Sequence, residues 1–326
     1  MKPRHISDSF LKELKTGFFK PIVDIIRVDP SLDLEMRGNS VIIYYRGGKI
    51  LKIAEPQGVI NSRAEAEQLL EGISPDYMKD DSLSSYLTQP TIDNIHVYFA
   101  NVKHLVDVFE ATVEQKLGEK EIQQRVIAEN NYSVNADKTD YFIADMEWAD
   151  NDGLNGRADI VAFYWGHMSH KKKDLTMYLI EVKQGHKAIK TEKPNTQKEG
   201  PGLLKHYHDF CEFRKDQAAV MCVKEDMLEV LRQKTELGLV LGLQELFEKD
   251  AEGNLTTKGI KIREEVDFVF LLANYLHFSK QLRNELLLLP KNAQFFCSSF
   301  VGYGLYKKYI VTKKTIANYP SIFVTE

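Results

Sequence analysis

The sequence has little of what marks secreted or membrane-spanning proteins. Its 326 residues include three cysteines, Cys211, Cys222 and Cys297. They are too widely spaced for a metal-ligand motif and favour a reducing compartment over a disulfide framework. The longest apolar runs, 266–278 and 286–289, are too short to cross a bilayer. The first residues also lack the apolar core of a signal peptide. We therefore expect a cytoplasmic protein without a membrane partner.

An excess of charge of one sign is missing as well. The formal net charge is −4, with 43% hydrophobic and 28% charged residues, which is the composition of an ordinary globular protein. A surface for nucleic acid must therefore be local, because the whole chain has no positive excess. The sequence contains no internal repeat and no low-complexity segment. Its length suits one large domain or two ordinary ones.

Residues 1–95 are expected to form an accessory region made of a helix, a β-hairpin and a second helix. The first helix spans residues 7–26 and is broken near Gly17 and Pro21. The hairpin spans residues 41–53 and turns at Gly47-Gly48. The second helix, 63–71, has Asn61 and Glu65 near its start, one residue away from the usual capping-box spacing. Three roles stay open for this region: target selection, association of the chain with itself, and extension of the sheet.

Residues 96–326 are expected to form the main α/β domain. Apolar periodicity and turn residues predict helices, strands and a C-terminal strand or helix extension. The predicted helices cover 96–117, 120–130, 201–211, 224–237 and 279–289, and the predicted strands cover 141–149, 157–165, 175–184, 218–223, 266–273 and part of 295–312.

Three charged residues interrupt two of these apolar strands. Asp159 follows Arg157-Ala158, while Glu181 and Lys183 flank Val182 at alternate positions and so share one face of their strand. A charge on a buried strand is unfavourable unless it is paired or binds a metal. Two carboxylates and a lysine on adjacent strands are suited to a hard divalent cation with a cationic donor beside it.

The order helix, strand, strand, strand, helix, strand between residues 120 and 223 resembles the PD-(D/E)XK nuclease superfamily. The motif consists of Asp159 in Gly-Arg-Ala-Asp-Ile-Val and Glu181-Val182-Lys183 in Ile-Glu-Val-Lys-Gln-Gly. The family often has a proline before the aspartate, where this chain has alanine. The resemblance implies a restriction-endonuclease-like αβββαβ core, with a mixed central sheet flanked by helices. Glu121 matches the acidic residue that such families often place on the helix before the first strand.

The resemblance also implies a Mg²⁺ or Mn²⁺ cofactor and hydrolysis of phosphodiester bonds, in DNA rather than RNA. Asp159 and Glu181 would bind the metal through carboxylate oxygens. The carbonyl of Val182 and the carboxylate of Glu121 are further ligands that the family implies. Lys183 would position the attacking water and stabilise the developing charge.

Weaker roles follow for other polar residues. Gln184 could orient the water or a phosphate oxygen. Contacts with a nucleic-acid backbone are expected at Lys171, Lys172, Lys173, Lys205 and Tyr207. The three consecutive lysines are also explained as a solvated hairpin tip, and the same explanation serves for the HxxH pair His167 and His170.

Each assignment has a simpler alternative. Glu181 and Lys183 could form an ion pair on an exposed strand face, and Asp159 could be a residue of a turn. Glu147 on the first strand is a rival acidic ligand. The tail, residues 303–314, alternates tyrosine and lysine, which fits an amphipathic strand or a surface that stacks on a nucleic-acid strand. At the level of function, the alternatives are a catalytically silent module that binds nucleic acid or protein, and an enzyme acting on a small phosphate ester.

Overall fold

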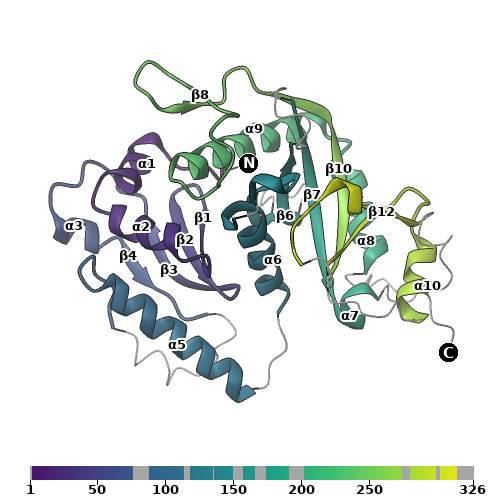
Figure 1. Cartoon of the computed structure of the whole chain (residues 1–326), viewed down its shortest axis with the longest axis horizontal. Coiled ribbons are helices and arrows are strands. Elements are labelled where there is room, and N and C mark those ends of the chain that lie inside the picture. Colours follow the sequence, from purple (N-terminus) through teal and green to yellow (C-terminus); the bar gives the residue numbers. More distant parts are fainter. Residues whose placement is uncertain are drawn as a thin grey trace. The chain divides into compact units, whose positions relative to one another are not determined.

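The structure is a computed structural model that describes residues 2–75, 88–113, 118–134, 136–149, 157–165, 174–190, 202–273, 280–298 and 302–313 (Figure 1). The chain divides into two compact units. Unit 1 comprises 135–225 and 259–326, and unit 2 comprises 2–134 and 226–258. The boundary expected between residues 95 and 96 falls at the first residue of helix α5 (Ile95–Val113), inside unit 2. No helix within the described ranges is long and apolar enough to cross a membrane.

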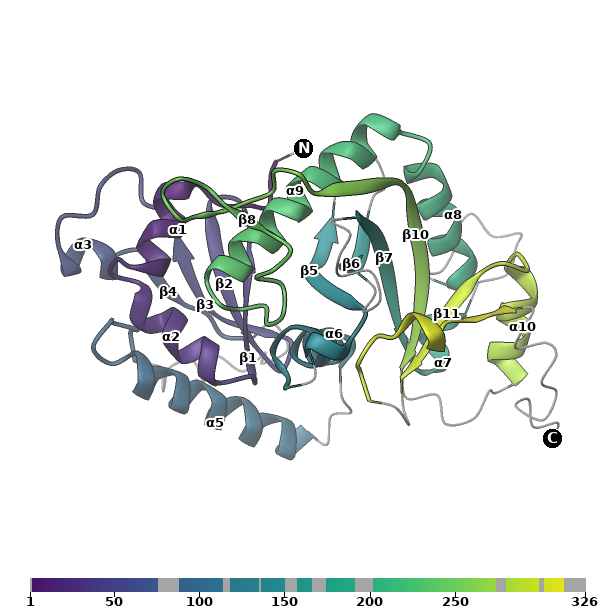
Figure 2. The ribbon, with the colours of Figure 1, turned by 45° about the horizontal axis from the view of Figure 1, so that its top comes forward.

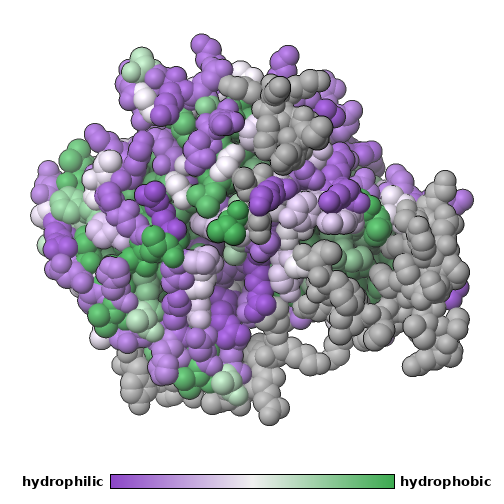
Figure 3. Space-filling model, in the orientation of Figure 1, coloured by the Kyte–Doolittle hydropathy of each residue, from purple (hydrophilic) through white to green (hydrophobic). Residues whose placement is uncertain are grey.

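Surface hydrophobicity is scattered on the face drawn in Figure 3. Outside the grey atoms, hydrophobic residues form small groups separated by hydrophilic ones. Singly exposed apolar side chains such as Val28 and Val59 are normal on a protein surface.

Unit 2 contains a four-stranded antiparallel sheet with helices around it. The strand order is β1-β2-β3-β4, and every neighbouring pair is antiparallel. The elements of unit 2 are α1 (Asp8–Lys15), α2 (Lys20–Val28), β1 (Leu32–Met36), β2 (Ser40–Tyr45), β3 (Gly48–Ala54), α3 (Arg63–Glu67), β4 (Leu70–Gly72), α5, α6 (Glu119–Ile127), η1 (Ala128–Tyr132), β8 (Glu248–Lys249) and β9 (Leu255–Thr256).

The N-terminal expectations are correct in kind and inexact in their limits. The first helix is indeed interrupted near Gly17. Helix α3 stops at Glu67, and its N-cap is Ser62, whose hydroxyl accepts a hydrogen bond from the Glu65 N–H at 3.3 Å. The Glu65 carboxylate accepts from the N–H of Asn61, one residue before the N-cap, and the chain after the helix turns into strand β4.

The hairpin turn lies one residue earlier than predicted. Tyr45 pairs with Gly48, so the two turn residues are Arg46 and Gly47, with φ angles of 48° and 76°. Two consecutive positive φ angles match the twist of the flanking strands. Arg46 tolerates this backbone because its guanidinium binds carboxylates of helices α5 and α6, including Asp107 at 3.0 Å.

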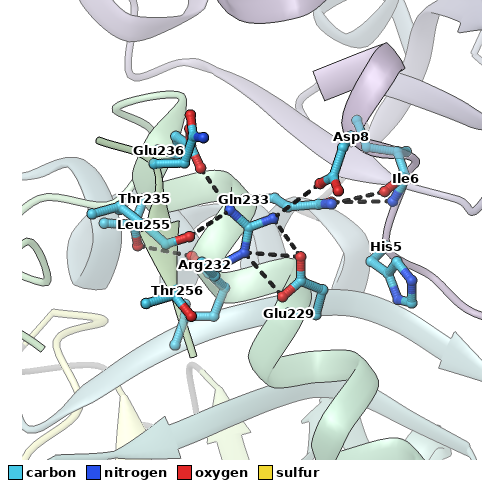
Figure 4. Close-up of polar contacts among 12 residues, drawn as sticks. His5, Ile6, Asp8, Glu229, Arg232, Gln233, Thr235, Glu236, Leu255 and Thr256 are labelled. Atoms are coloured by element: carbon cyan, nitrogen blue, oxygen red, sulfur yellow. Dashed lines mark hydrogen bonds and ion pairs between the residues drawn. The ribbon is translucent and has the colours of Figure 1, made fainter. Parts of the chain in front are cut away.

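Helix α9 (Gln217–Glu236) contributes its second half to unit 2. There Arg232 is 7% exposed and donates to both oxygens of Glu229 at 2.9 Å, to Glu236 at 2.6 Å and to the carbonyl of Leu255 at 3.0 Å (Figure 4). These bonds attach strand β9 to the helix. Nearby, Lys234 and Glu35 form a fully buried ion pair at 2.7 Å.

Unit 1 is built on a six-stranded mixed sheet with the order β12-β11-β10-β7-β6-β5. β5, β6 and β7 form an antiparallel meander, and β10 runs parallel to both β7 and β11 (Figure 2). The elements of unit 1 are η2 (Ala136–Lys138), β5 (Tyr141–Ala149), β6 (Arg157–Tyr164), β7 (Asp174–Gln184), α7 (Gly185–Ile189), α8 (Leu203–Phe213), the first half of α9, β10 (Lys261–Ala273), α10 (Lys280–Leu288), β11 (Gln294–Ser298), η4 (Lys307–Tyr309) and β12 (Val311–Thr312).

The strand predicted at 218–223 is wrong, because these residues begin helix α9. Val220, Val223 and Met227 are buried at intervals of three and four, which is a helical period. A short apolar run does not distinguish a strand from a buried helix segment. The strand after the helices of this unit is instead β10, which lies next to β7. The general class holds: unit 1 is α/β with a mixed sheet and helices beside it.

The two faces of this sheet differ. Helix α8 lies on the face of Phe268, since Phe210 stacks on that ring at 4.7 Å between centroids. The opposite face is aromatic, with Tyr141 at 4.9 Å from Tyr178 and 5.5 Å from Phe296.

Candidate functional site

Strands β6 and β7 diverge at the level of Asp159. Their pairing runs from Tyr164 with Thr176 to Ile160 with Ile180 and stops there, although both strands continue. The carboxylate of Asp159 takes the place of the next backbone partner, because its Oδ2 accepts a hydrogen bond from the Val182 N–H at 2.7 Å. A side chain therefore occupies the gap between the two strands.

Glu181 and Lys183 lie beside this gap and are bonded to each other. The Lys183 Nζ donates to the Glu181 Oε1 at 2.6 Å. Asp159, Glu181 and Lys183 are only 5%, 1% and 4% exposed. An exposed ion-pair face therefore does not describe Glu181 and Lys183. Asp159, being inside β6, is not a turn residue either.

A histidine that the sequence analysis did not select joins the pair. From helix α8, His206 places Nδ1 at 3.1 Å from the Glu181 Oε1 and Nε2 at 3.3 Å from the Lys183 Nζ. A neutral imidazole protonated on Nδ1 satisfies both contacts, since it donates to the carboxylate and accepts from the ammonium. The available signal was helical spacing: the buried positions of α8 are Leu203, His206, Phe210 and Phe213.

Burial dominates the electrostatics of Asp159. Desolvation raises the pKa of Asp159 above its ordinary value, while the charge of Lys183 and the hydrogen bond from the Val182 N–H act in the opposite direction. Glu147 on β5 raises the pKa of Asp159 further by charge repulsion. Glu147 also has a φ of 55° inside a strand, which is unusual for a residue with a side chain. The rival carboxylate is thus close enough to influence the site.

The backbone of Val182 also faces the gap. The N–H and C=O of one residue point to the same edge of a strand, and the N–H of Val182 meets Asp159. Its carbonyl is therefore directed toward β6 beyond the last paired residues. Gln184 has the opposite orientation to Lys183, because successive side chains of a strand alternate between faces.

The contacts described for other predicted residues are with different partners. Glu121 belongs to unit 2, where it accepts from Arg125 at 2.8 Å and lies 3.4 Å from Arg46. Lys205 forms an ion pair with Asp209 at 2.7 Å on the same helix. The ring of Tyr207 packs against Phe268. Lys171, Lys172 and Lys173 lie outside the described residues, as do His167 and His170.

The donor set partly fits a divalent cation. Two carboxylates and a directed carbonyl provide the oxygen ligands that Mg²⁺ prefers, and waters usually complete its shell. Among the described residues, no group of three or more histidine, cysteine, aspartate or glutamate side chains is arranged to hold a metal. Any metal here would thus depend on Asp159, Glu181 and backbone or water oxygens.

Comparison with protein-family models, with curated proteins and with solved structures gives no match.

Proposed function

We propose that the chain is a Mg²⁺- or Mn²⁺-dependent phosphodiester hydrolase that cleaves DNA. The observation that carries the proposal is the convergence of Asp159, Glu181 and Lys183 where β6 and β7 diverge. A buried carboxylate whose pKa is raised by desolvation, as at Asp159, is found at functional sites more often than elsewhere.

The arrangement of unit 1 supports a PD-(D/E)XK-like core. An antiparallel meander of three strands is followed by helices and by a strand parallel to the third. This is the strand order of the proposed core, with β10 in the place expected for residues 218–223. The aspartate lies on the second strand and Glu-x-Lys on the third, as the resemblance requires.

The proposed roles follow from the contacts. Asp159 and Glu181 hold the cation through carboxylate oxygens, and the Val182 carbonyl adds a neutral oxygen. These two carboxylates and one ammonium carry a net charge of −1, and a bound divalent cation would change it to +1, which favours an anionic phosphate beside the site. A bound Mg²⁺ supplies polarisation of the phosphate and a lowered pKa for the attacking water.

Lys183 and His206 act on the water and the phosphate. The Lys183 ammonium, now bonded to Glu181 at 2.6 Å, positions the water and stabilises the charge that develops on the phosphate. His206 orients both partners, since its two ring nitrogens contact Glu181 and Lys183.

We keep the cytoplasm as the proposed compartment, because the three cysteines form no disulfide.

The test uses substitutions that keep the shape of the side chains. Asp159→Asn, Lys183→Met and the pair Glu181→Gln/Lys183→Met should each lower Mg²⁺-dependent cleavage of DNA by about 100-fold or more. Lys215→Met is the matched control, because Lys215 is exposed in the same unit and pairs with Glu212. Circular dichroism must show that each variant is folded. Cleavage by a folded Asp159→Asn protein at the wild-type rate would reject the proposal.

A silent binding module on the same fold is the second candidate. The observation in its favour is that Lys183 and Glu181 already form a buried ion pair. Calorimetric titration with Mn²⁺ and Mg²⁺ distinguishes the two functions when combined with the cleavage assay. Binding of nucleic acid without metal-dependent turnover would support the module.

A further inference from the structure

The tail between β11 and β12 is not the amphipathic strand that its alternating tyrosines and lysines predict. Within the described residues 302–313, the strand is confined to Val311–Thr312, and Lys307–Tyr309 forms a single 3-10 turn. Lys307, Lys308 and Tyr309 are all exposed, with Tyr309 at 45%. Burial against the sheet therefore does not explain why aromatic and basic residues alternate here.

The lysines of this turn lie over tyrosine rings. The Lys307 Nζ is 4.2 Å from the ring centroid of Tyr164, at the end of β6. The Lys308 Nζ is 4.9 Å from the ring of Tyr309 and 5.8 Å from that of Tyr306. The rings of Tyr306 and Tyr309 meet edge to face at 5.5 Å. We call these five residues the tyrosine–lysine surface.

The turn is bonded to Asp140, the residue that precedes β5. The Lys307 N–H donates to the Asp140 carboxylate at 2.8 Å, and the Asp140 N–H donates to the Leu305 carbonyl at 3.0 Å. The aromatic and basic side chains are thus presented from a fixed backbone. Figure 3 shows hydrophilic atoms at the surface over the yellow segment that precedes β12 in Figure 1.

The ammonium groups are available to an anion. Within the described part of the chain, neither Lys307 nor Lys308 forms an ion pair with a carboxylate. Their contacts are with tyrosine faces, and a cation–π contact at an exposed site is weak. A phosphate would therefore attract each ammonium away from its ring.

We propose that the tyrosine–lysine surface binds an unpaired nucleic-acid strand. Bases would stack on Tyr309 and Tyr306, and the two lysines would neutralise phosphates, which is the combination that single-strand binding uses. An acidic peptide offers the anions but not the flat rings, so it would leave the stacking faces unused.

This surface is separate from the candidate metal site. Tyr164 follows Asp159 by five residues, which is about 17 Å along a strand at ~3.3 Å per residue. Its side chain lies on the other face of the sheet, because positions 159 and 164 differ by an odd number. Binding here does not require Asp159, Glu181 or a metal, so this inference stands independently of the nuclease proposal.

The experiment measures fluorescence anisotropy of labelled oligo(dT) and oligo(rU) with the full chain in EDTA, where metal-dependent cleavage is absent. Lys307→Ala/Lys308→Ala should raise the Kd about tenfold or more at low salt and reduce the salt slope, since two phosphate contacts are lost. Tyr309→Ala should raise the Kd by about fivefold or more, whereas Tyr309→Phe should bind as the wild type does because it keeps the ring. The two oligonucleotides show whether DNA or RNA is preferred.

Lys249→Ala/Lys258→Ala is the charge-matched control, because it removes two exposed lysines from unit 2. It should leave the Kd within about twofold of the wild-type value, since those lysines lie outside the surface. Three results would each overturn the inference. They are unchanged binding by the Lys307/Lys308 variant, equal losses for Tyr309→Phe and Tyr309→Ala, and equal displacement of the strand by polyglutamate. Thermal melting verifies that all variants are folded.

Discussion

At the scale of single residues, two buried lysines each form an ion pair with a buried carboxylate. Lys183 has Glu181, and Lys234 has Glu35. The two pairs differ in what surrounds them. His206 and Asp159 lie close to the first, beside a gap between strands, whereas the second links helix α9 to strand β1 within unit 2. Burial alone therefore does not distinguish a candidate site, whereas several charged groups gathered where two strands diverge favour one.

The contact between His5 and Asp226 depends on pH. Its Nδ1 lies 2.6 Å from the Asp226 carboxylate, and this hydrogen bond raises the pKa of His5 above its ordinary value, against the opposing effect of burial. The stabilisation is complete below the ordinary pKa and disappears as pH rises through the raised one.

We therefore predict that His5→Gln loses more unfolding free energy, relative to wild type, at about pH 5.5 than at about pH 9. Urea unfolding at both pH values measures the difference. His104→Gln, at an exposed histidine of helix α5, serves as the control. A deficit of the same size at both pH values would show that the charged form of His5 does not contribute.

At the scale of elements, the β2–β3 hairpin shows how a turn depends on its neighbours. Gly47 has a φ of 76°, and a Cβ placed there would lie 2.6 Å from the backbone N of Glu121 and from the carbonyl carbon of Lys120. The N–H of Gly47 also donates to the Gln124 side chain at 2.7 Å. The hairpin thus has no free space against helix α6.

Gly47→Ala should lower the free energy of unfolding by about 2–4 kcal/mol, because backbone strain adds to a clash that rigid backbone cannot relieve. Gly253→Ala is matched to it, since Gly253 has a φ of 86° but nothing within 4 Å of the added Cβ. The control should lose only about 1–2 kcal/mol from strain. Denaturant unfolding measures both variants. Equal losses of unfolding free energy would show that the clash with helix α6 does not contribute.

At the scale of the whole molecule, the two units are not consecutive in sequence. Unit 2 needs residues 226–258 as well as its N-terminal part. The Gln233 side chain both donates to and accepts from the backbone of Ile6, and Lys234 bonds Glu35. A fragment that ended at residue 95 would therefore lack residues 226–258, which supply buried contacts of unit 2.

A chain beginning at residue 96 should consequently fail to unfold cooperatively. It lacks strands β1 to β4. It also leaves Lys234 without Glu35, and removing one partner of a buried ion pair lowers the free energy of unfolding by about 3–5 kcal/mol. Calorimetry and solubility measurements test this. A single cooperative transition near the wild-type temperature would show that residues 96–326 are an independent domain after all.

The sequence alone was sufficient for the local parts of this protein. It predicted both ends of β5 correctly, and it predicted the ends of β6 and β7 to within one residue. It also placed Asp159, Glu181 and Lys183 on strands and correctly predicted the ends of α9 and α10 near Gly238 and Pro290. These features depend on apolar period and turn chemistry, which act between neighbours in the chain.

Only the tertiary structure decided which distant segments meet. It put β10, and not residues 218–223, beside β7, brought His206 to Glu181, and paired Glu121 with Arg125 and Arg46 inside unit 2. The physical reason is that side-chain periodicity specifies a face but not its partner. Partners are chosen by packing and by neutralisation of buried charge, which involve residues far apart in sequence.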